Sequence, residues 1–315
     1  MKFTPSELRI STMTITSDIN SDINLSVISN ELSLVDYYSN DIGCIKIELG
    51  GMTTRGYCKK DIENKTKKKK TFYNQATTII RVADKENSLK EVNCKLFSNG
   101  RIQMTGIKSI HSAESSLKLL FDSIKNLSNL DNDGNVVNAV TDKINAHCGK
   151  INIHLINSDY TTGFKIKRDV LHDLLVNSYN IYSTYEPCIY PGVNTKYYWN
   201  TTNTMEGVCD CSEECNGKGR GDGDGKCKKV TISIFQSGAI IITGATSIEQ
   251  LNAAYSFINR VLDENFEELE RQPPPEPIEQ NTIKILKKQK VWLKKDNIKT
   301  NNILYHMDNN EHISK

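Results

Sequence analysis

The sequence predicts an α+β fold built from a duplicated module of strands and helices. Two thirteen-residue segments, Phe97–Ser109 (FSNGRIQMTGIKS) and Phe235–Ser247 (FQSGAIIITGATS), are identical at six aligned positions. Each contains a turn with a glycine, and polar and apolar residues alternate on both sides of that turn. Each is followed by a stretch with apolar residues at helical spacing. A repeat this long indicates a two-fold duplication rather than an array of short repeats.

The period-two pattern on both sides of each turn predicts a β-hairpin in each copy. Alternate side chains of a strand share a face, so one face of each hairpin is expected to be apolar and to pack against a core. The apolar faces comprise Val92, Cys94, Leu96, Ile102 and Met104 in the first copy and Val230, Ile232, Ile234, Ile240 and Ile242 in the second.

A helix is expected after each hairpin. His111–Leu127 and Ser247–Leu262 carry apolar residues three and four positions apart, which places one apolar stripe on each helix. Ser247 followed by Gln250 predicts a capping box. Because each stripe and each apolar sheet face need a partner, each helix is expected to lie on its own sheet. Earlier elements recur in the order strand then helix, at 8–16 and 24–32 and again at 150–158 and 167–176.

The opposite face of the hairpins carries polar or small groups and one aromatic residue per copy. Phe97 and Phe235 each end a strand beside the turn. A large aromatic on an exposed polar face either packs beneath a neighbouring loop or contacts a ligand. The DNA minor groove offers mainly acceptors and can be opened by apolar wedges, so such a face suits it. The other members of this face are Asn93, Lys95, Gln103, Thr105, Thr231, Ser233, Ile241 and Thr243.

These residues resemble the TATA-box-binding protein (TBP) family. TYEPCIYPGVNTKYYW (Thr184–Trp199) followed by VTISIFQSGAIIITGA is similar to its second repeat, which has Tyr-Glu-Pro, aromatic-Pro-Gly, a basic residue, Phe-x-Ser-Gly and Thr-Gly-Ala in order. VNCKLFSNGRIQMTGIKS is the first-repeat counterpart, and the resemblance covers about residues 8–265. It implies a TBP-like pseudo-symmetric saddle, in which two repeats form one curved antiparallel sheet with helices on the convex face.

The resemblance also implies DNA-contacting residues. Tyr190 and Phe235 match the pair that kinks DNA, and Phe97 is the first-repeat phenylalanine. The partner of Phe97 is Phe72 or Tyr73, although an ungapped count back from Arg81 reaches Gln75. The remaining DNA-contacting positions are Thr105 and Thr243 at the groove floor, Arg81, Arg101 and Lys196 at phosphates, and Asn152, Lys95 and Gln103 elsewhere on the concave face.

Some positions depart from the family pattern. Leu8 and Lys150 stand where the family has a central Asn pair that bonds bases, with Asn152 nearby. Four polar residues stand where the family prefers apolar ones, namely Lys95, Gln103, Thr231 and Ser233. A concave face this polar makes fewer apolar contacts to sugars and bases. This departure argues against tight, TATA-selective binding but not against the predicted fold.

The implied function is that of a general transcription initiation factor that binds and bends AT-rich promoter DNA through the minor groove. A transcription factor IIB-like factor and RNA polymerase are the implied partners. The alternative is a protein–protein scaffold of the same fold in transcription, with weak or no DNA binding. A DNA-processing enzyme with the saddle as its targeting module is a third option. No phosphate loop or paired-carboxylate motif follows a strand, so an enzyme is not expected.

Two insertions interrupt the repeats. The first contains KTKKKK, which either neutralises phosphates or forms a solvated loop. The second lies where the family has a short stirrup loop, and we expect it beside the kinking pair. The expected divisions are a first repeat at 1–127 with an insertion at about 36–71, a linker at 128–149, a second repeat at 150–265 with an insertion at about 200–229, and a Pro linker and basic tail at 266–315.

The second insertion is rich in cysteine. Four thiolates suit a tetrahedral zinc site, although the spacing C-x-C-x3-C-x11-C is not that of a standard finger. A flexible loop with free thiols is the alternative, and no other cofactor is expected. The candidate ligands are Cys209, Cys211, Cys215 and Cys227.

Bulk properties restrict the class of protein. The net charge is only +2 over 315 residues, so overall charge names no partner. No signal peptide begins the chain and no apolar run is long enough to span a bilayer, so no membrane association is expected. An odd count of nine cysteines favours a reducing compartment. We expect an intracellular protein, in the nucleus or, for a viral protein, in a cytoplasmic virus factory or virion.

Overall fold

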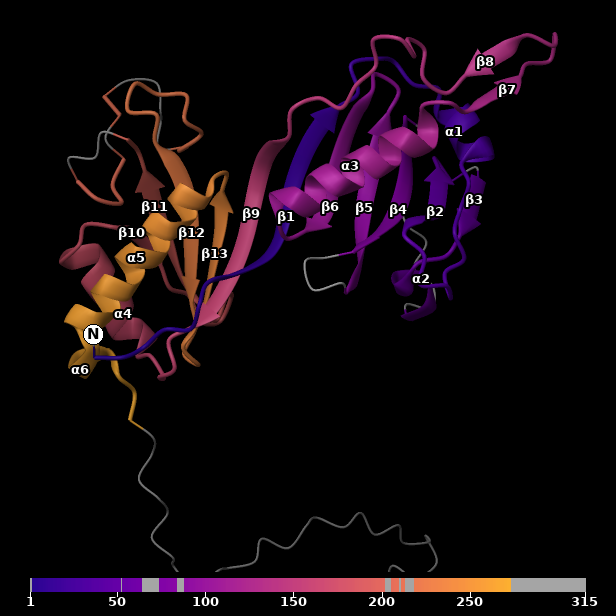
Figure 1. The fold of residues 1–315 in the computed structure, drawn as a ribbon. Coiled ribbons are helices and arrows are strands. Elements are labelled where there is room, and N and C mark those ends of the chain that lie inside the picture. Colours follow the sequence, from indigo (N-terminus) through magenta and orange to yellow (C-terminus); the bar gives the residue numbers. More distant parts are fainter. Residues whose placement is uncertain are drawn as a thin grey trace, which may run out of the picture. The chain divides into compact units, whose positions relative to one another are not determined.

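One curved antiparallel sheet of eleven strands organises the fold (Figure 1). The computed structural model describes residues 2–51, 53–63, 74–83, 88–201, 205–209, 211–212 and 218–272. The strand order is β10-β11-β12-β13-β9-β1-β6-β5-β4-β2-β3. Read outward from the central β1–β9 pair, strands β6, β5 and β4 on one side correspond to β13, β12 and β11 on the other. The two repeats therefore form the two halves of one sheet.

The bounds of the elements are as follows. The strands of the large sheet are β1 (Arg9–Asp18), β2 (Gly43–Leu49), β3 (Thr53–Gly56), β4 (Gln75–Ala83), β5 (Leu89–Phe97), β6 (Arg101–Ile107), β9 (Asn152–Thr161), β10 (Tyr182–Thr184), β11 (Val193–Trp199), β12 (Lys228–Ile234) and β13 (Ala239–Ala245). A separate hairpin consists of β7 (Ser128–Leu130) and β8 (Val136–Asn138). The helices are α1 (Leu25–Glu31), α2 (Lys59–Glu63), α3 (Ile110–Ile124), α4 (Arg168–Asn177), α5 (Ile248–Glu264) and α6 (Phe266–Leu269).

The β1–β9 ladder contains a pseudo-two-fold axis. Met13 lies opposite Ile156, and the pairs on either side mirror one another. The register shifts once on each side, and the residues passed over are Ser11 and His154. A bulge in each strand thus preserves the symmetry. The mirrored pairs are Thr12–Asn157 with Thr14–Leu155, Ile10–Ser158 with Ile15–Ile153, and Arg9–Asp159 with Thr16–Asn152.

The core lies between one sheet face and the helices. The apolar hairpin residues predicted to share a face are buried in it, from Val92 and Leu96 in the first repeat to Ile232 and Ile242 in the second. Figure 1 shows α3 and α5 lying across this face, one over each half. Burial of these faces is the main favourable term that holds each helix on its sheet.

Side chains cap the long helices. Ser109 Oγ accepts from the Ser112 amide at 3.1 Å, and Ser247 Oγ accepts from the Gln250 amide at 3.2 Å. The predicted capping box differs in one contact, because Gln250 Oε1 accepts from the amide of Thr246 rather than from that of Ser247. Among the described helices, none combines the length and the apolar content that a bilayer crossing requires.

A second apolar cluster lies on the opposite face of the sheet. Along β4, Ile80 and Val82 belong to the main core, whereas Ile79 packs with Ile45 and Cys58 in a separate cluster. Because alternate residues of a strand point to opposite faces, this cluster lies on the face that the long helices leave open. One corner of that face, in the first repeat, is therefore covered by chain from the first insertion.

Gly238 fixes the turn of the second hairpin. Its φ is +85°, and a Cβ there would lie 2.2 Å from the Phe164 carbonyl oxygen. Gly134, in the β7–β8 turn, has a φ of +83°, but an added Cβ there meets no atom of the described chain within 4 Å. A non-glycine residue would therefore be strained in its backbone at both positions, but it would clash with neighbouring atoms only at Gly238.

We expect Gly134→Ala to lower the free energy of unfolding by about 1–2 kcal/mol, the cost of a left-handed non-Gly residue. We expect Gly238→Ala to lower it by about 1–3 kcal/mol more, because the backbone must also shift. Urea denaturation of both variants and the wild type measures the difference. Equal losses in the two variants would contradict the close approach at Gly238.

Candidate nucleic-acid interface

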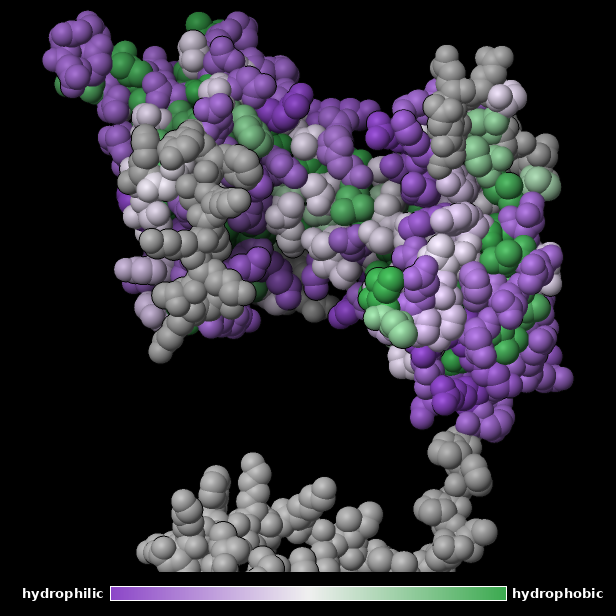
Figure 2. All heavy atoms as spheres, turned by 180° about the vertical axis from the view of Figure 1, so that it is seen from behind, coloured by the Kyte–Doolittle hydropathy of each residue, from purple (hydrophilic) through white to green (hydrophobic). Residues whose placement is uncertain are grey.

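The sheet face opposite the long helices is the candidate interface, here called the open face. Figure 2 shows the molecule from behind the view of Figure 1, where polar and weakly polar residues predominate and apolar ones are isolated. The open face is defined by the strand residues that alternate with those facing the helices: Asn194, Lys196, Tyr198, Lys229, Thr231, Ser233, Ala239, Ile241, Thr243, Asn157, Asp159, Thr12, Thr14, Thr16, Arg101, Gln103, Thr105, Asn93, Lys95 and Thr77.

Hydroxyl and amide groups gather at the centre of the open face. Thr105 lies opposite Thr14, and Thr243 lies opposite Asn157, in symmetry-related positions. Thr243 Oγ1 donates a hydrogen bond to Asn157 Oδ1. This bond holds the Asn157 side chain over the sheet next to the pseudo-dyad.

Asn157 was not among the residues predicted from the sequence. The predicted central residue, Asn152, lies at the start of β9, opposite Thr16, and is exposed. The signal that finds Asn157 is its pairing with Thr243, which depends on the register between β13 and β9.

Tyr190 and Phe235 form an aromatic pair at one extremity of the open face. Their ring centroids are 5.7 Å apart at 63°, an edge-to-face contact. Tyr190 is 39% exposed and Phe235 is half-buried. Gly192 lies against both rings, because a Cβ there would be 2.9 Å from Tyr190 Cε1 and 3.1 Å from Phe235 Cε1. The structure thus brings together two residues predicted as a pair.

Arg168 of α4 fastens the segments that carry these rings. Its guanidinium donates to the Pro191 carbonyl oxygen and, at 3.0 Å, to Gln236 Oε1. The same guanidinium lies 5.2 Å from the centroid of the Tyr185 ring, a cation–π contact. Pro191 follows Tyr190 and Gln236 follows Phe235, so one side chain fixes both ring-bearing segments.

The first repeat presents Phe97 in the equivalent place. Leu96 pairs with Ala76 as Ile234 pairs with Val193. Tyr190 is three residues before Val193, and the same count back from Ala76 reaches Tyr73 in the sequence. Tyr73 lies outside the described residues. Gln75 lies directly opposite Phe97, and the choice between Phe72 and Tyr73 as its partner stays a prediction.

Basic side chains of the open face occupy different environments. Lys196 Nζ donates to Thr231 Oγ1 at 3.0 Å, and partial burial, together with repulsion by Lys229, lowers the pKa of its ammonium. Arg101 is exposed and lies opposite Asp18. Lys95 is half-buried opposite Gln103. A phosphate near Lys196 would supply the negative charge that its surroundings lack.

Arg81 has a structural role, in contrast to its predicted phosphate contact. It is only 5% exposed. Its guanidinium donates to the carbonyl oxygens of Tyr37 and Ser39 and lies 5.5 Å from the Tyr37 ring centroid. By register, the first-repeat counterpart of Lys196 is Ile79, because Ile79 pairs with Asn93 as Lys196 pairs with Thr231. The basic positions are therefore not symmetric.

Asp61 holds the chain that covers this corner. It accepts from Lys46 Nζ at 2.8 Å and from the amide and thiol of Cys58 at 2.9 and 3.0 Å. Partial burial raises the pKa of this carboxyl, but the hydrogen bonds from Cys58 and Lys46 outweigh burial and lower it to about 2. A lowered pKa stabilises the fold above the ordinary carboxyl pKa, and the contribution is lost as the pH falls through about 2.

The cysteine-rich insertion lies at the other end of the β11–β12 pair from the aromatic pair. Val193 and Ile234 pair near the aromatic residues, whereas Trp199 pairs with Lys228 where the insertion begins and ends. The expectation that it adjoins the kinking pair is wrong, because the seven residue pairs of the β11–β12 ladder separate them. Three of the four candidate ligands converge, namely Cys209, Cys211 and Cys227, and Cys215 lies outside the described residues.

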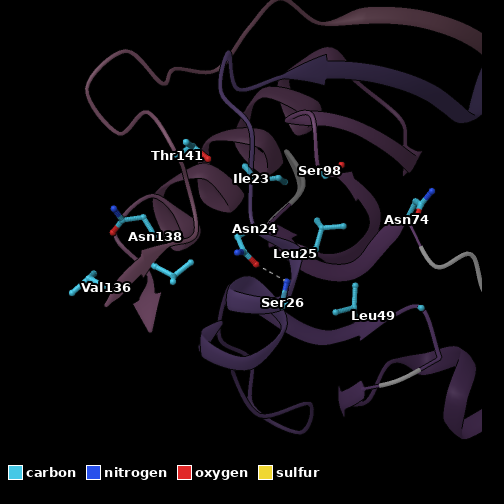
Figure 3. A pocket seen from close by; sticks show the side chains of 12 residues that line it. Ile23, Asn24, Leu25, Ser26, Leu49, Asn74, Ser98, Val136, Asn138 and Thr141 are labelled. Atoms are coloured by element: carbon cyan, nitrogen blue, oxygen red, sulfur yellow. Dashed lines mark hydrogen bonds between the residues drawn. The ribbon is translucent and has the colours of Figure 1, made fainter. Parts of the chain in front are cut away.

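A pocket of about 640 Å³ lies beside α1 in the first repeat (Figure 3). Aliphatic, amide and hydroxyl side chains line it, and no acidic, basic, His or Cys side chain of the described chain does. Asn24 Oδ1 already caps α1 by accepting from the amides of Ser26 and Val27. The pocket thus gathers none of the side chains that commonly act as general acids or bases.

Comparisons with known proteins find similar sequences and one similar structure. Residues 150–265 match the sequence model of the family described as "Transcription factor TFIID (or TATA-binding protein, TBP)". A "TATA-box-binding protein-like" protein of Acanthamoeba polyphaga mimivirus is 26% identical over 289 residues, which cover 88% of this chain and 70% of that protein. Among solved structures, Methanococcus jannaschii TBP is 18% identical to this chain and has a TM-score of 0.43. The alignment covers 83% of this chain and 99% of the archaeal chain.

The two-fold sheet, its helix-covered face and its open face define a pseudo-symmetric α+β saddle. The matched segment spans β9 to α5, which is the complete second repeat. The chain resembles the TATA-box-binding protein family, because its second repeat matches the family model and a TATA-box-binding protein-like relative is similar over most of its length.

Removal of the Asp61 charge should loosen the cover over the open face. We expect Asp61→Asn to speed alkylation of Cys58 by roughly threefold to tenfold, because the hydrogen bonds that hold the cover are lost and the carboxylate no longer raises the pKa of the Cys58 thiol. Peptide mass spectrometry after timed alkylation at neutral pH measures the rate at Cys58. Glu63→Gln, an equivalent change at an exposed position of α2, is the control and should leave the rate unchanged. Equal rates in all three proteins would show that Asp61 does not hold the cover.

Proposed function

We propose that this protein binds duplex DNA in the minor groove with its open face and bends it with the Tyr190–Phe235 pair. The observation that supports this most strongly is the contact of these two rings at an extremity of the open face. The match of residues 150–265 to the TBP family model is a second support. Promoter recognition in transcription initiation is the corresponding biological role, without catalysis by this chain.

The centre of the open face suits the groove floor. Minor-groove edges present acceptors on both A·T and T·A pairs, and G·C pairs add an amino group that obstructs close approach. The hydroxyls of Thr14 and Thr105 and the amide of Asn157 are donors of suitable size. Such a face distinguishes AT-rich from GC-rich DNA but reads little further sequence, so deformability supplies the remaining selectivity.

The aromatic pair suits a wedge between base pairs. Apolar side chains inserted from the minor groove unstack a base step and kink the duplex, which lets more protein surface touch DNA. Two rings already in contact, and held by Arg168 through Pro191 and Gln236, need little reordering on binding. Phe97 supplies the corresponding ring in the first repeat.

Partners in the transcription machinery, such as a transcription factor IIB-like factor and RNA polymerase, are proposed from the resemblance to the TBP family alone. A second candidate function is a transcription scaffold that binds proteins through the same fold. The observation in its favour is the cover over Ile79 and Arg81, which removes one corner of the open face from any ligand.

Truncation of the wedge separates these functions. We expect Phe235→Ala and Tyr190→Ala each to weaken binding to an AT-rich duplex by about 1–3 kcal/mol, roughly fivefold to 150-fold, because stacking on a base is lost. Fluorescence anisotropy measures affinity, and energy transfer between dyes at the duplex ends measures the bend. Leu130→Ala, which removes an exposed apolar side chain on β7, is the control.

The bend should decrease with the affinity in both wedge variants and remain in the control. If the wild-type chain binds neither AT-rich nor GC-rich duplexes at low salt, the scaffold is the function. If Phe235→Ala and Tyr190→Ala bind and bend DNA as the wild type does, the wedge is wrong.

Removal of a phosphate contact should change the salt dependence of binding. For Lys196→Ala and Arg101→Ala we expect the slope of log K against log salt to become shallower by about 0.9 each, because one fewer counterion is released. Titrations at several salt concentrations with AT-rich and GC-rich duplexes give the slopes. Lys118→Ala, an exposed position of α3 on the helix-covered face, should not alter the slope. An equal change in Lys118→Ala would place the phosphate contacts elsewhere.

A further inference from the structure

The cysteine-rich insertion contains a cluster of three thiols that the DNA-binding proposal does not use. The Cys209 and Cys227 sulfurs are 3.3 Å apart, those of Cys211 and Cys227 are 3.4 Å apart, and all three lie within 4.8 Å of one another. Zinc bonded to sulfur at about 2.3 Å in a tetrahedron holds its sulfurs about 3.8 Å apart. The two sulfur–sulfur distances to Cys227 are shorter than that value by about half an ångström or less, so one ion fits among the three sulfurs after small side-chain rotations.

Two segments of the insertion bring these cysteines together. Before Cys209, the Tyr198 amide donates to the Gly207 carbonyl oxygen at 2.9 Å, which ties that segment to the end of β11. Before Cys227, the Arg220 segment bridges to Lys228 at the start of β12. Cys209 and Cys227 are far apart in sequence but meet because both segments are anchored to the same end of the β11–β12 pair.

The environment of Cys227 is that of a structural metal ligand. Its side chain has no exposed surface, and Cys209 and Cys211 are half-buried beside it. The residues between Cys215 and Cys227 are NGKGRGDGDGK, without an apolar side chain that could form a core of their own. Segments that cannot bury enough apolar surface commonly depend on a metal or a cross-link for a fixed structure.

We propose that Cys209, Cys211 and Cys227 bind one Zn²⁺ ion, which clasps the insertion to the β11–β12 end of the sheet. Thiolates select zinc among the common divalent ions of the cell. Three thiolates and Zn²⁺ carry a net charge of −1, and Lys226 and Lys228 flank Cys227 in the chain with opposite charge. No fourth His, Cys, Asp or Glu of the described part of the chain joins the three, so another ligand completes the tetrahedron.

This site is independent of the proposed DNA contact. It lies at the end of β11–β12 remote from Tyr190 and Phe235, and no residue of the aromatic pair touches it. A chain that binds no DNA should still hold the ion. The metal content and the DNA affinity therefore test two separate proposals.

The test is the zinc content of the full-length chain purified under reducing conditions. We expect about one zinc per chain by elemental mass spectrometry, and a thiolate-to-metal absorption band when Co²⁺ replaces Zn²⁺. Cys227→Ser and Cys211→Ser should each lower the zinc content about tenfold or more, because a thiolate ligand is lost. Cys188→Ser removes an exposed cysteine outside the cluster and should keep the wild-type content.

Limited proteolysis provides a second readout in case Cys227→Ser does not fold. Cys211 is half-buried, so the fold should tolerate its substitution, and a chelator should expose the insertion to cleavage in the wild type. A reduced wild-type chain that holds no zinc and gives no Co²⁺–thiolate band would overturn the proposal. So would unchanged zinc in both cysteine variants, or a Cys209–Cys227 disulfide in protein prepared with reductant.

Discussion

The antiparallel pairing of β1 with β9 is the constraint on which the rest of the structure depends. It joins the two repeats across Met13 and Ile156 and makes one sheet with one core face and one open face. The bulges at Ser11 and His154 lie symmetrically about this point. Without this ladder each repeat would expose a long strand edge, which proteins normally avoid. Every residue of the candidate interface takes its position from this register.

The two halves of the open face share one strand register but differ in their residues and in how much of the face is covered. The second half keeps an exposed aromatic pair and a basic residue, Lys196, beside Thr231. The first half adds β2 and β3 to the sheet edge and folds part of the insertion beneath Ile79 and Arg81. A protein that grips DNA with such a face would therefore contact its two ends unequally, with the better-defined wedge in the second repeat.

Local periodicity predicted much of the fold, because alternation and helical stripes need no knowledge of distant contacts. The hairpin faces, the long helices and the capping serine at Ser247 follow from it. Residues whose roles depend on long-range pairing were missed. Every second residue after Asn152 should face the same side of the sheet, but this count reaches Ile156, which is a core residue. The bulge at His154 exchanges the two faces, so Asn157 was not predicted to lie on the open face. Arg81 was misassigned because a loop distant in sequence folds over it. A local sequence pattern does not predict such a long-range contact.

Photo-crosslinking tests the central claim, that the open face is the surface that meets DNA. A photoreactive residue in place of Gln103 lies on the open face, and one in place of Lys118 lies on α3 over the opposite face. Irradiation with an AT-rich duplex should give a covalent protein–DNA product from position 103 and none from position 118. A product from position 118 alone, or equal yields from both, would contradict the account.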